Sequence, residues 1–231
     1  MKIKLSKAGN YGIFYILEDT NTLKNAVGIF YGHTKTDLSQ IDLSNLESGK
    51  DMFSNAGTAK SFTGNLQRLK YGDSMFSSSY FTSFDSDLKN LIDGHFMFSM
   101  SKIETFNSDL SSLVRGESMF SLSKLQSFNS NLNSILIADS MFSRTSIQTF
   151  TTNVSTLKIG VHFFENCSKL EEIQSNFSSL VNGAYLCKGC TNLKNFDARL
   201  SNLISGTKAF SDCKLNASSV LKISNNIKDL N

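Results

Sequence analysis

Proline and tryptophan are both absent from this chain of 231 residues. Average usage of about 5% would give roughly a dozen prolines. Charged residues make up 19% of the chain, and the formal net charge of +3 is too small to indicate nucleic-acid binding. No apolar run approaches the ~20 residues of a membrane helix, so membrane insertion is not expected. Phenylalanine is abundant at 19 residues, and a Phe-rich chain without proline is unlike a typical enzyme.

A repeat of 22 to 23 residues underlies this composition. The dipeptide Met-Phe recurs at this spacing as Met52-Phe53, Met75-Phe76, Met97-Phe98, Met119-Phe120 and Met141-Phe142. Degenerate copies extend the series, at Ile29-Phe30 before it and at Phe163-Phe164, Leu186-Cys187 and Ala209-Phe210 after it. Such regularity over most of the chain indicates a repeat architecture.

A second aromatic column keeps the same spacing, at Phe62, Phe84, Phe106, Phe128, Phe150, Ile173 and Phe196. Columns of Leu and Gly follow it, for example Leu110, Leu113 and Gly116 after Phe106. One coil of this length cannot bury its own apolar side, whereas stacked coils can, so the columns predict a solenoid. Each strand is expected at the second Phe, and each Gly at a bend that needs a positive φ or a close approach. The Leu-x-x-Leu-x-x-Gly stretch fits either a loose helical turn or an extended arc.

Several of these motifs resemble the BspA-like bacterial leucine-rich repeats. They include residues 124–128 with Leu132, Leu136 and Met141-Phe142, the spacing Phe164-x-x-Cys167-x-x-Leu170, and the ending at 212–216. The resemblance covers roughly residues 38–216. It implies a leucine-rich-repeat solenoid, a right-handed superhelix with a parallel β-sheet on the concave face and short helical turns. It also implies a place among surface or host-contacting proteins of bacteria and their mobile elements, and it carries no common catalytic residues. The absence of proline departs from many members.

The two ends depart from the repeat. Residues 2–5 and 12–17 flank Gly9-Asn10 and predict a β-hairpin cap. Asn216 or Ser218 can cap a C-terminal helix whose apolar side carries Val220, Ile223, Ile227 and Leu230. The predicted organisation is a cap over residues 1–28, about eight coils over 29–215 and a capping helix over 216–231. With both caps present, the chain is expected to be complete.

The chain has four cysteines and three histidines as candidate reactive or metal-binding groups. Cys187 and Cys190 have C-x-x-C spacing, which is compatible with redox chemistry or zinc. However, Cys187 replaces a core Phe, and Cys167, Cys190 and Cys213 share a column of small residues, which favours buried structural cysteine. A disulfide within that column is left open. His33, His95 and His162 fall in unlike positions and form no ligand pair, so neither a metal nor a cofactor is predicted.

The outward residues around the second Phe column form the candidate binding face. Lys60 and Lys194 oppose five carboxylates there, which gives this face a charge of −3 and argues against phosphate binding. No aromatic side chain is expected on it to stack with sugars or bases. The alternatives are a solvated sheet surface or a flat polar surface for a protein or glycan. The residues selected are Asp85, Glu104, Thr105, Asn107, Gln126, Asn129, Gln148, Thr151, Glu172 and Gln174.

The predicted function is a non-enzymatic scaffold for macromolecular recognition, as a phage tail-associated or other virion protein that contacts the host surface. The alternative is an intracellular bacterial protein–protein interaction module. An enzyme is disfavoured because no acid/base pair, nucleophile or metal set stands outside the repeat columns. Residues 1–17 lack the apolar core of a signal peptide. The predicted location is therefore the bacterial cytoplasm or a phage virion.

Overall fold

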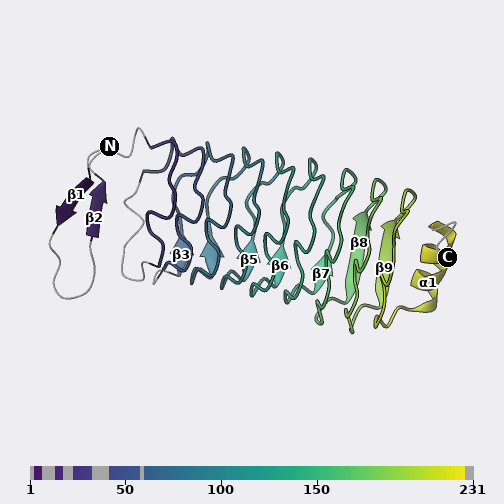
Figure 1. The fold of residues 1–231 in the computed structure, drawn as a ribbon. Coiled ribbons are helices and arrows are strands. Elements are labelled where there is room, and N and C mark those ends of the chain that lie inside the picture. Colours follow the sequence, from purple (N-terminus) through teal and green to yellow (C-terminus); the bar gives the residue numbers. More distant parts are fainter. Residues whose placement is uncertain (1–2, 7–13, 18–22, 33–41, 58–59, 227–231) are drawn as a thin grey trace.

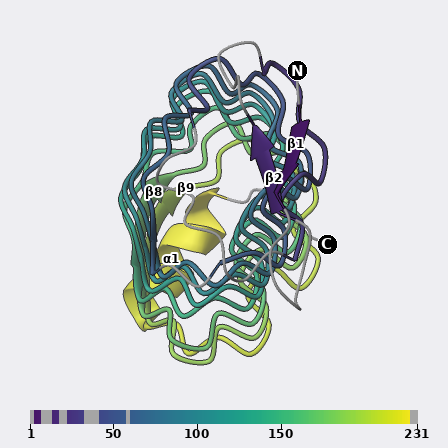
Figure 2. The same ribbon diagram turned by 90° about the vertical axis from the view of Figure 1, so that its left-hand side faces the viewer.

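A computed structural model describes residues 3–6, 14–17, 23–32, 42–57 and 60–226. The repeats form a single stack of coils, each lying directly on the next (Figure 1). Seen end-on, successive coils follow nearly the same closed outline (Figure 2). The predicted solenoid is confirmed. Residues of one sequence column occupy equivalent places in successive coils, which is why the sequence repeats every 22 to 23 residues.

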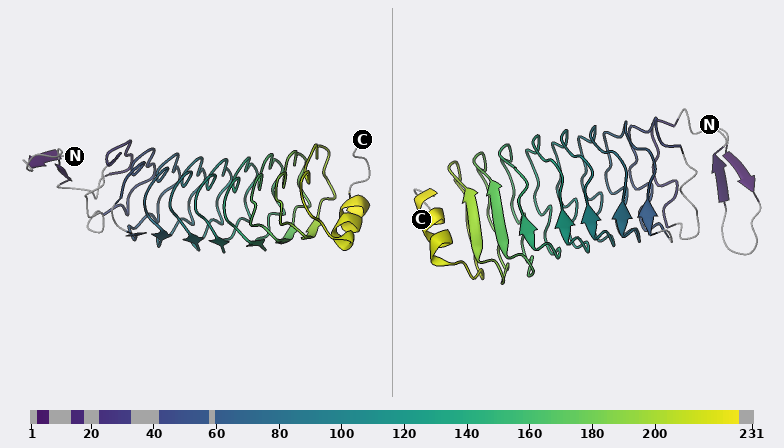
Figure 3. Two further views of the ribbon diagram at one scale, coloured as in Figure 1. Left: turned by 90° about the horizontal axis from the view of Figure 1, so that it is seen from below. Right: turned by 180° about the vertical axis from the view of Figure 1, so that it is seen from behind.

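One side of the solenoid is a ladder of short parallel strands (Figure 3). Equivalent residues pair in register, so Phe106 lies beside Phe128 and Thr105 beside Ser127. In each short strand the Phe is buried and the preceding Ser or Thr points outward, as the alternation predicts. The strands are β3 (Ser61–Phe62), β4 (Ser83–Phe84), β5 (Thr105–Phe106), β6 (Ser127–Phe128), β7 (Thr149–Phe150), β8 (Glu172–Asn176) and β9 (Asn195–Arg199).

A second parallel ladder runs along the arc, with one bridging residue in each coil. Its members are Asn25, Ser48, Tyr71, Asp93, Arg115, Ile137, Ile159, Asn182 and Ser205. The arc itself, which the sequence left open, consists of hydrogen-bonded turns such as Leu113 N–H to the Leu110 carbonyl. Between residues 23 and 216, the described part of the chain contains no helix.

The Gly that recurs three residues before most Met-Phe pairs has a packing cause. A Cβ at Gly72 would lie 2.8 Å from Sδ of Met97 in the next coil, and one at Gly94 would lie 3.1 Å from Sδ of Met119. Neither glycine has a positive φ. Of the two reasons expected for these glycines, close approach is the one that applies.

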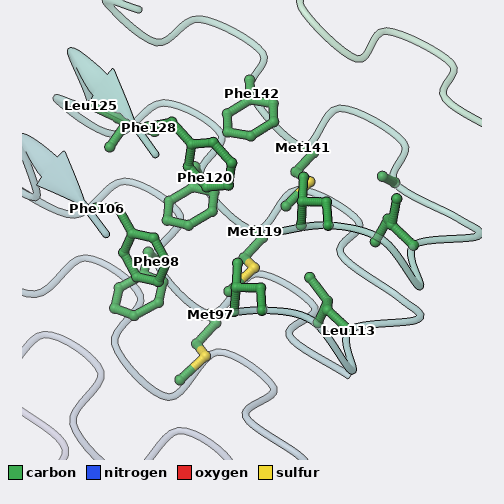
Figure 4. Packing of buried hydrophobic residues seen from close by; sticks show 14 of the residues in the cluster. Met97, Phe98, Phe106, Leu113, Met119, Phe120, Leu125, Phe128, Met141 and Phe142 are labelled. Atoms are coloured by element: carbon green, nitrogen blue, oxygen red, sulfur yellow. The ribbon is translucent and has the colours of Figure 1, made fainter. Parts of the chain in front are cut away.

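The two Phe columns meet in the middle of each coil (Figure 4). Phe98 stacks on Phe120 of the next coil at a centroid distance of 5.4 Å, and Phe106 meets Phe120 edge-on at 4.9 Å. The Met column is completely buried beside them, at Met52, Met75, Met97, Met119 and Met141. Phe98 and Phe106 of one coil meet edge-on at 5.2 Å, so side chains of the Met-Phe turn segment and of the strand ladder pack against each other in the core.

The ends contain the elements that the sequence predicts. Strands β1 (Ile3–Ser6) and β2 (Phe14–Leu17) pair antiparallel, and their connection lies outside the described residues. Helix α1 (Ala217–Asn226) begins after Asn216, whose Oδ1 accepts the Ser219 N–H at 2.8 Å. This helix packs against β9, where Ser219 Oγ accepts the Phe196 N–H at 2.9 Å.

The predicted apolar side of this helix is partly wrong. Val220 is 53% exposed, whereas Ser219 is buried and Ile223 is partly buried. Ser219 occupies the inward position because it satisfies backbone groups at the open edge of β9. Ile227 and Leu230 lie outside the described residues.

The first coil already includes residues 23–32, since Ala26 N–H donates to the Ser48 carbonyl at 2.9 Å. The division into caps and repeats at residues 28 and 215 stays a prediction. No helix in the described ranges is long and apolar enough to span a membrane.

Candidate functional site

The strand face consists of the outward side chains of β3 to β9 and their flanking residues. Of the ten residues selected from the sequence, nine are exposed and Glu172 is half-buried. The parallel register aligns them in rows along the solenoid. Gln126 N–H donates to the Glu104 carbonyl at 2.8 Å, and Asn129 N–H donates to the Phe106 carbonyl at 3.0 Å. These bonds hold adjacent coils, and therefore adjacent side chains of each row, at strand spacing.

Three rows of polar side chains result from this register. One row contains Glu104, Gln126 and Gln148, and a second contains Thr105 with Glu172 further along. The third contains Asp85, Asn107, Asn129, Thr151 and Gln174. The selected residues therefore lie on one continuous surface, as predicted, although their role in binding stays a prediction.

Hydrogen bonding on the strand face leaves most of its polar groups to solvent. Gln174 Nε2 donates to Glu172 Oε1 at 3.2 Å. At the C-terminal end, Lys222 of α1 pairs with Asp197 at 2.8 Å. The amides and hydroxyls of the middle coils can therefore both donate to and accept from an external partner.

The cysteines occupy the small-residue column that the sequence indicates. Cys167 Sγ donates to the Phe142 carbonyl at 2.9 Å, Cys190 Sγ to the Phe164 carbonyl at 3.0 Å, and Cys213 Sγ to the Cys187 carbonyl at 3.1 Å. All four thiols are free. Burial raises the pKa of Cys167 well above its usual range and the pKa of Cys213 to about 11. Both thiols are therefore protonated near neutral pH and are poor nucleophiles.

The histidines lie in different environments. The His162 ring stacks on Tyr185 at 4.6 Å, and its Nδ1 lies 2.9 Å from Glu165 Oε2. The same carboxylate accepts from Lys188 Nζ at 3.1 Å. His95 stacks on Phe96, and His33 lies outside the described residues. Within the ranges that the structure describes, no three His, Cys, Asp or Glu side chains are placed to share a metal ion.

Comparison with known families assigns the repeat. A family model for the BspA type leucine-rich repeat region matches residues 47–171 and 94–216, with six copies. The chain belongs to the BspA-type leucine-rich repeat family. Repeats of this type are typically non-enzymatic scaffolds, and their stacked architecture suggests a protein-interaction module.

One solved structure is also similar to this BspA-type chain, a leucine-rich repeat protein from Bacteroides ovatus. The two sequences are 16% identical, and the TM-score is 0.43. The match covers 76% of this chain and 58% of that one. No curated protein matches the chain.

The BspA-type chain also exposes large apolar side chains that the sequence analysis did not single out. None of the exposed large apolar residues in the described part of the chain lies on the strand face. Part of the signal was present in the sequence, because Phe96, Met100 and Leu122 stand in columns that are mostly polar or Gly in other coils. The exposed residues are Val27, Tyr31, Tyr71, Tyr80, Ile92, Phe96, Met100, Leu122, Leu136, Val181, Ile204, Val220 and Leu221.

Proposed function

We propose that this BspA-type protein is a non-enzymatic scaffold that recognises a macromolecule through its strand face. The supporting observation is the exposed polar surface of seven successive strands. The strands pair in parallel as β3-β4, β5-β6 and β7-β8-β9, and backbone hydrogen bonds such as Glu104 N–H to the Thr82 carbonyl join these groups. A rigid surface loses little conformational freedom on binding, so side chains that are individually weak can act together.

The chemistry of this face favours a protein or a surface glycan as partner. Amide, hydroxyl and carboxylate groups offer many hydrogen bonds, and the excess of carboxylates disfavours a phosphate backbone. We propose further that recognition occurs at a bacterial surface, with the chain as part of a phage tail or another virion component. The resemblance to repeats of surface and host-contacting proteins supports this context. An intracellular protein–protein interaction module is the second candidate, and the protein-interaction character of the repeat supports it equally.

A cell-binding experiment tests the proposal. Labelled protein is incubated with intact bacteria and, separately, with immobilised cytosolic extract. Binding to cells is expected to weaken in the triple variant Glu104→Ala, Gln126→Ala, Gln148→Ala. It should be retained in the control triple variant Lys158→Ala, Thr191→Ala, Thr207→Ala, whose exposed side chains lie off the strand face.

The outcomes separate the candidate partners. Loss of binding after periodate treatment of the cells indicates a glycan, and loss after protease treatment indicates a protein. Binding to cytosolic extract alone would favour the intracellular module. Equal weakening of both triple variants would contradict a role for the strand face.

A further inference from the structure

Each Met-Phe turn segment contains two positions with positive φ. In most coils the second of these positions carries a residue typical of turns, namely Gly32, Asn55, Ser78, Asn166, Gly189 and Asp212. In two central coils it carries Met100, with φ of 56°, and Leu122, with φ of 61°. Phe96 occupies the first such position of the Met100 coil, with φ of 53°. Bulky apolar side chains are disfavoured in this backbone conformation.

Burial does not offset the strain at these residues. Phe96 is 40% exposed, Met100 is 54% exposed and Leu122 is 47% exposed. The aromatic and imidazole side chains at positive φ have ring partners, since Phe96 stacks on His95 and His162 stacks on Tyr185. Strained apolar residues that remain in water contribute little to folding, and backbone strain of this kind is concentrated at ligand-binding and other functional sites.

The three side chains belong to adjacent coils. Met100 N–H donates to the Ser121 carbonyl at 2.8 Å, which places Met100 directly beside Leu122 in the stack. Phe96 begins the turn segment that Met100 ends, and its ring stacks on His95 at 4.3 Å. Phe96, Met100 and Leu122 are named the apolar turn patch.

Exposed cations border this patch. Lys102 and Lys124 follow Met100 and Leu122 by two residues, and Arg144 is the next residue in the column after Leu122. None of the ion pairs formed by described residues includes these three cations. Elsewhere in the coils Lys50, Lys70 and Arg115 are each paired with a carboxylate. The patch therefore combines apolar side chains with three cations that form no ion pair with another described residue.

We propose that the apolar turn patch docks an acidic segment of a partner protein that also carries apolar side chains. Apolar side chains of the partner would cover Met100 and Leu122, and its carboxylates would face Lys102, Lys124 and Arg144. A symmetric pair of copies would bring two sets of these cations together, so the charges disfavour a second copy as occupant. Lys102 and Lys124 stand two residues before Glu104 and Gln126, so the cationic border of the patch adjoins the strand face. The inference rests on the turn segments and does not depend on the function proposed for that face.

Fluorescence polarisation with short synthetic peptides tests this assignment. The probe is a labelled peptide in which Glu and Asp alternate with Leu and Phe. One control peptide replaces the acidic residues by Lys, and another replaces the apolar residues by Ser. The wild-type protein is expected to bind only the acidic–apolar peptide, and more weakly at high salt.

Variants locate the binding surface. Met100→Ser with Leu122→Ser should weaken peptide binding about tenfold or more. Peptide binding should also weaken, and lose most of its salt dependence, in the triple variant Lys102→Gln, Lys124→Gln, Arg144→Gln, which leaves the apolar residues intact. The strand-face variant Asn107→Ala with Asn129→Ala, which leaves every charge in place, should bind the peptide normally, so failure of one surface is distinguishable from failure of the other. Thermal melts confirm that each variant is folded.

Three results would overturn the proposal. The first is a wild-type protein that does not bind the acidic–apolar peptide, or that binds the Ser control equally well. The second is unchanged binding in both patch variants. The third is a concentration-dependent dimer, measured by analytical ultracentrifugation, that disappears in Met100→Ser with Leu122→Ser, because it would identify a second copy as the occupant.

Discussion

Replacing Phe106 by Ala tests the stacked aromatic core most directly. Phe106 is completely buried, and its ring lies between those of Phe84 at 5.8 Å and Phe128 at 6.0 Å. It also meets Phe98 and Phe120 edge-on at 5.2 and 4.9 Å. Removing a buried Phe side chain costs about 3–5 kcal/mol, a large share of the ~5–15 kcal/mol that typically separates folded from unfolded domains.

The matched control is the neighbouring residue on the strand face. Asn107 is exposed, and Asn107→Ala should change the free energy of unfolding by no more than about 0.5 kcal/mol. Denaturant unfolding gives the two free energies, and hydrogen exchange shows where the loss is felt. Because coils contact only their neighbours, exchange in Phe106→Ala should rise most in the coils on either side. Equal losses for the two variants, or uniform exchange along the chain, would refute the assignment of inward and outward faces.

Three further predictions concern single positions. Gly72→Ala should lower the free energy of unfolding by about 1–3 kcal/mol, because the new Cβ would press on Met97. Denaturant titrations measure this loss, and no loss would mean that packing does not explain the Gly column. Leu122→Asn should raise the melting temperature, because Asn tolerates positive φ better than Leu and little apolar burial is lost. A lower melting temperature would show that Leu122 stabilises the fold. The folded-state pKa of Cys213 is raised from 9.0 to about 11, so its contribution to stability is present below pH 9 and is lost as the pH rises through 11. The fall in stability over this window, followed by circular dichroism, should be smaller in Cys213→Ser, and an identical fall would exclude Cys213 as its source.

Inward residues made most of the fold predictable from sequence. The Phe, Leu and Met columns repeat because each side chain must fill the same space between two neighbours, and that constraint fixed the strand positions and the outward strand face. The second ladder left no such signature, because residues as different as Tyr71, Asp93 and Arg115 bridge through backbone groups alone. The inward placement of Ser219 was equally hidden, since it depends on the open edge of β9.

The apolar turn patch shows a different limit. Its residues were visible as departures from polar columns, but the sequence does not state that those positions have positive φ. Without the backbone conformation, Met100 and Leu122 cannot be distinguished from other apolar residues close to the hydrophobic core. Their positive φ and their exposure together indicate a binding surface, and both properties are seen only in the structure.

The two ladders also make each coil an interchangeable unit. A whole coil inserted in register would find the same hydrogen-bond partners and the same Phe neighbours above and below, so duplication or loss of one coil should lengthen or shorten the molecule without redesigning its core. The consequences for the surfaces differ. A strand face that extends over many coils would merely change in length, whereas an extra coil between Met100 and Leu122 would separate two adjacent side chains by one full coil. Changes in repeat number are thus a route by which such a protein can alter one binding surface while preserving the other.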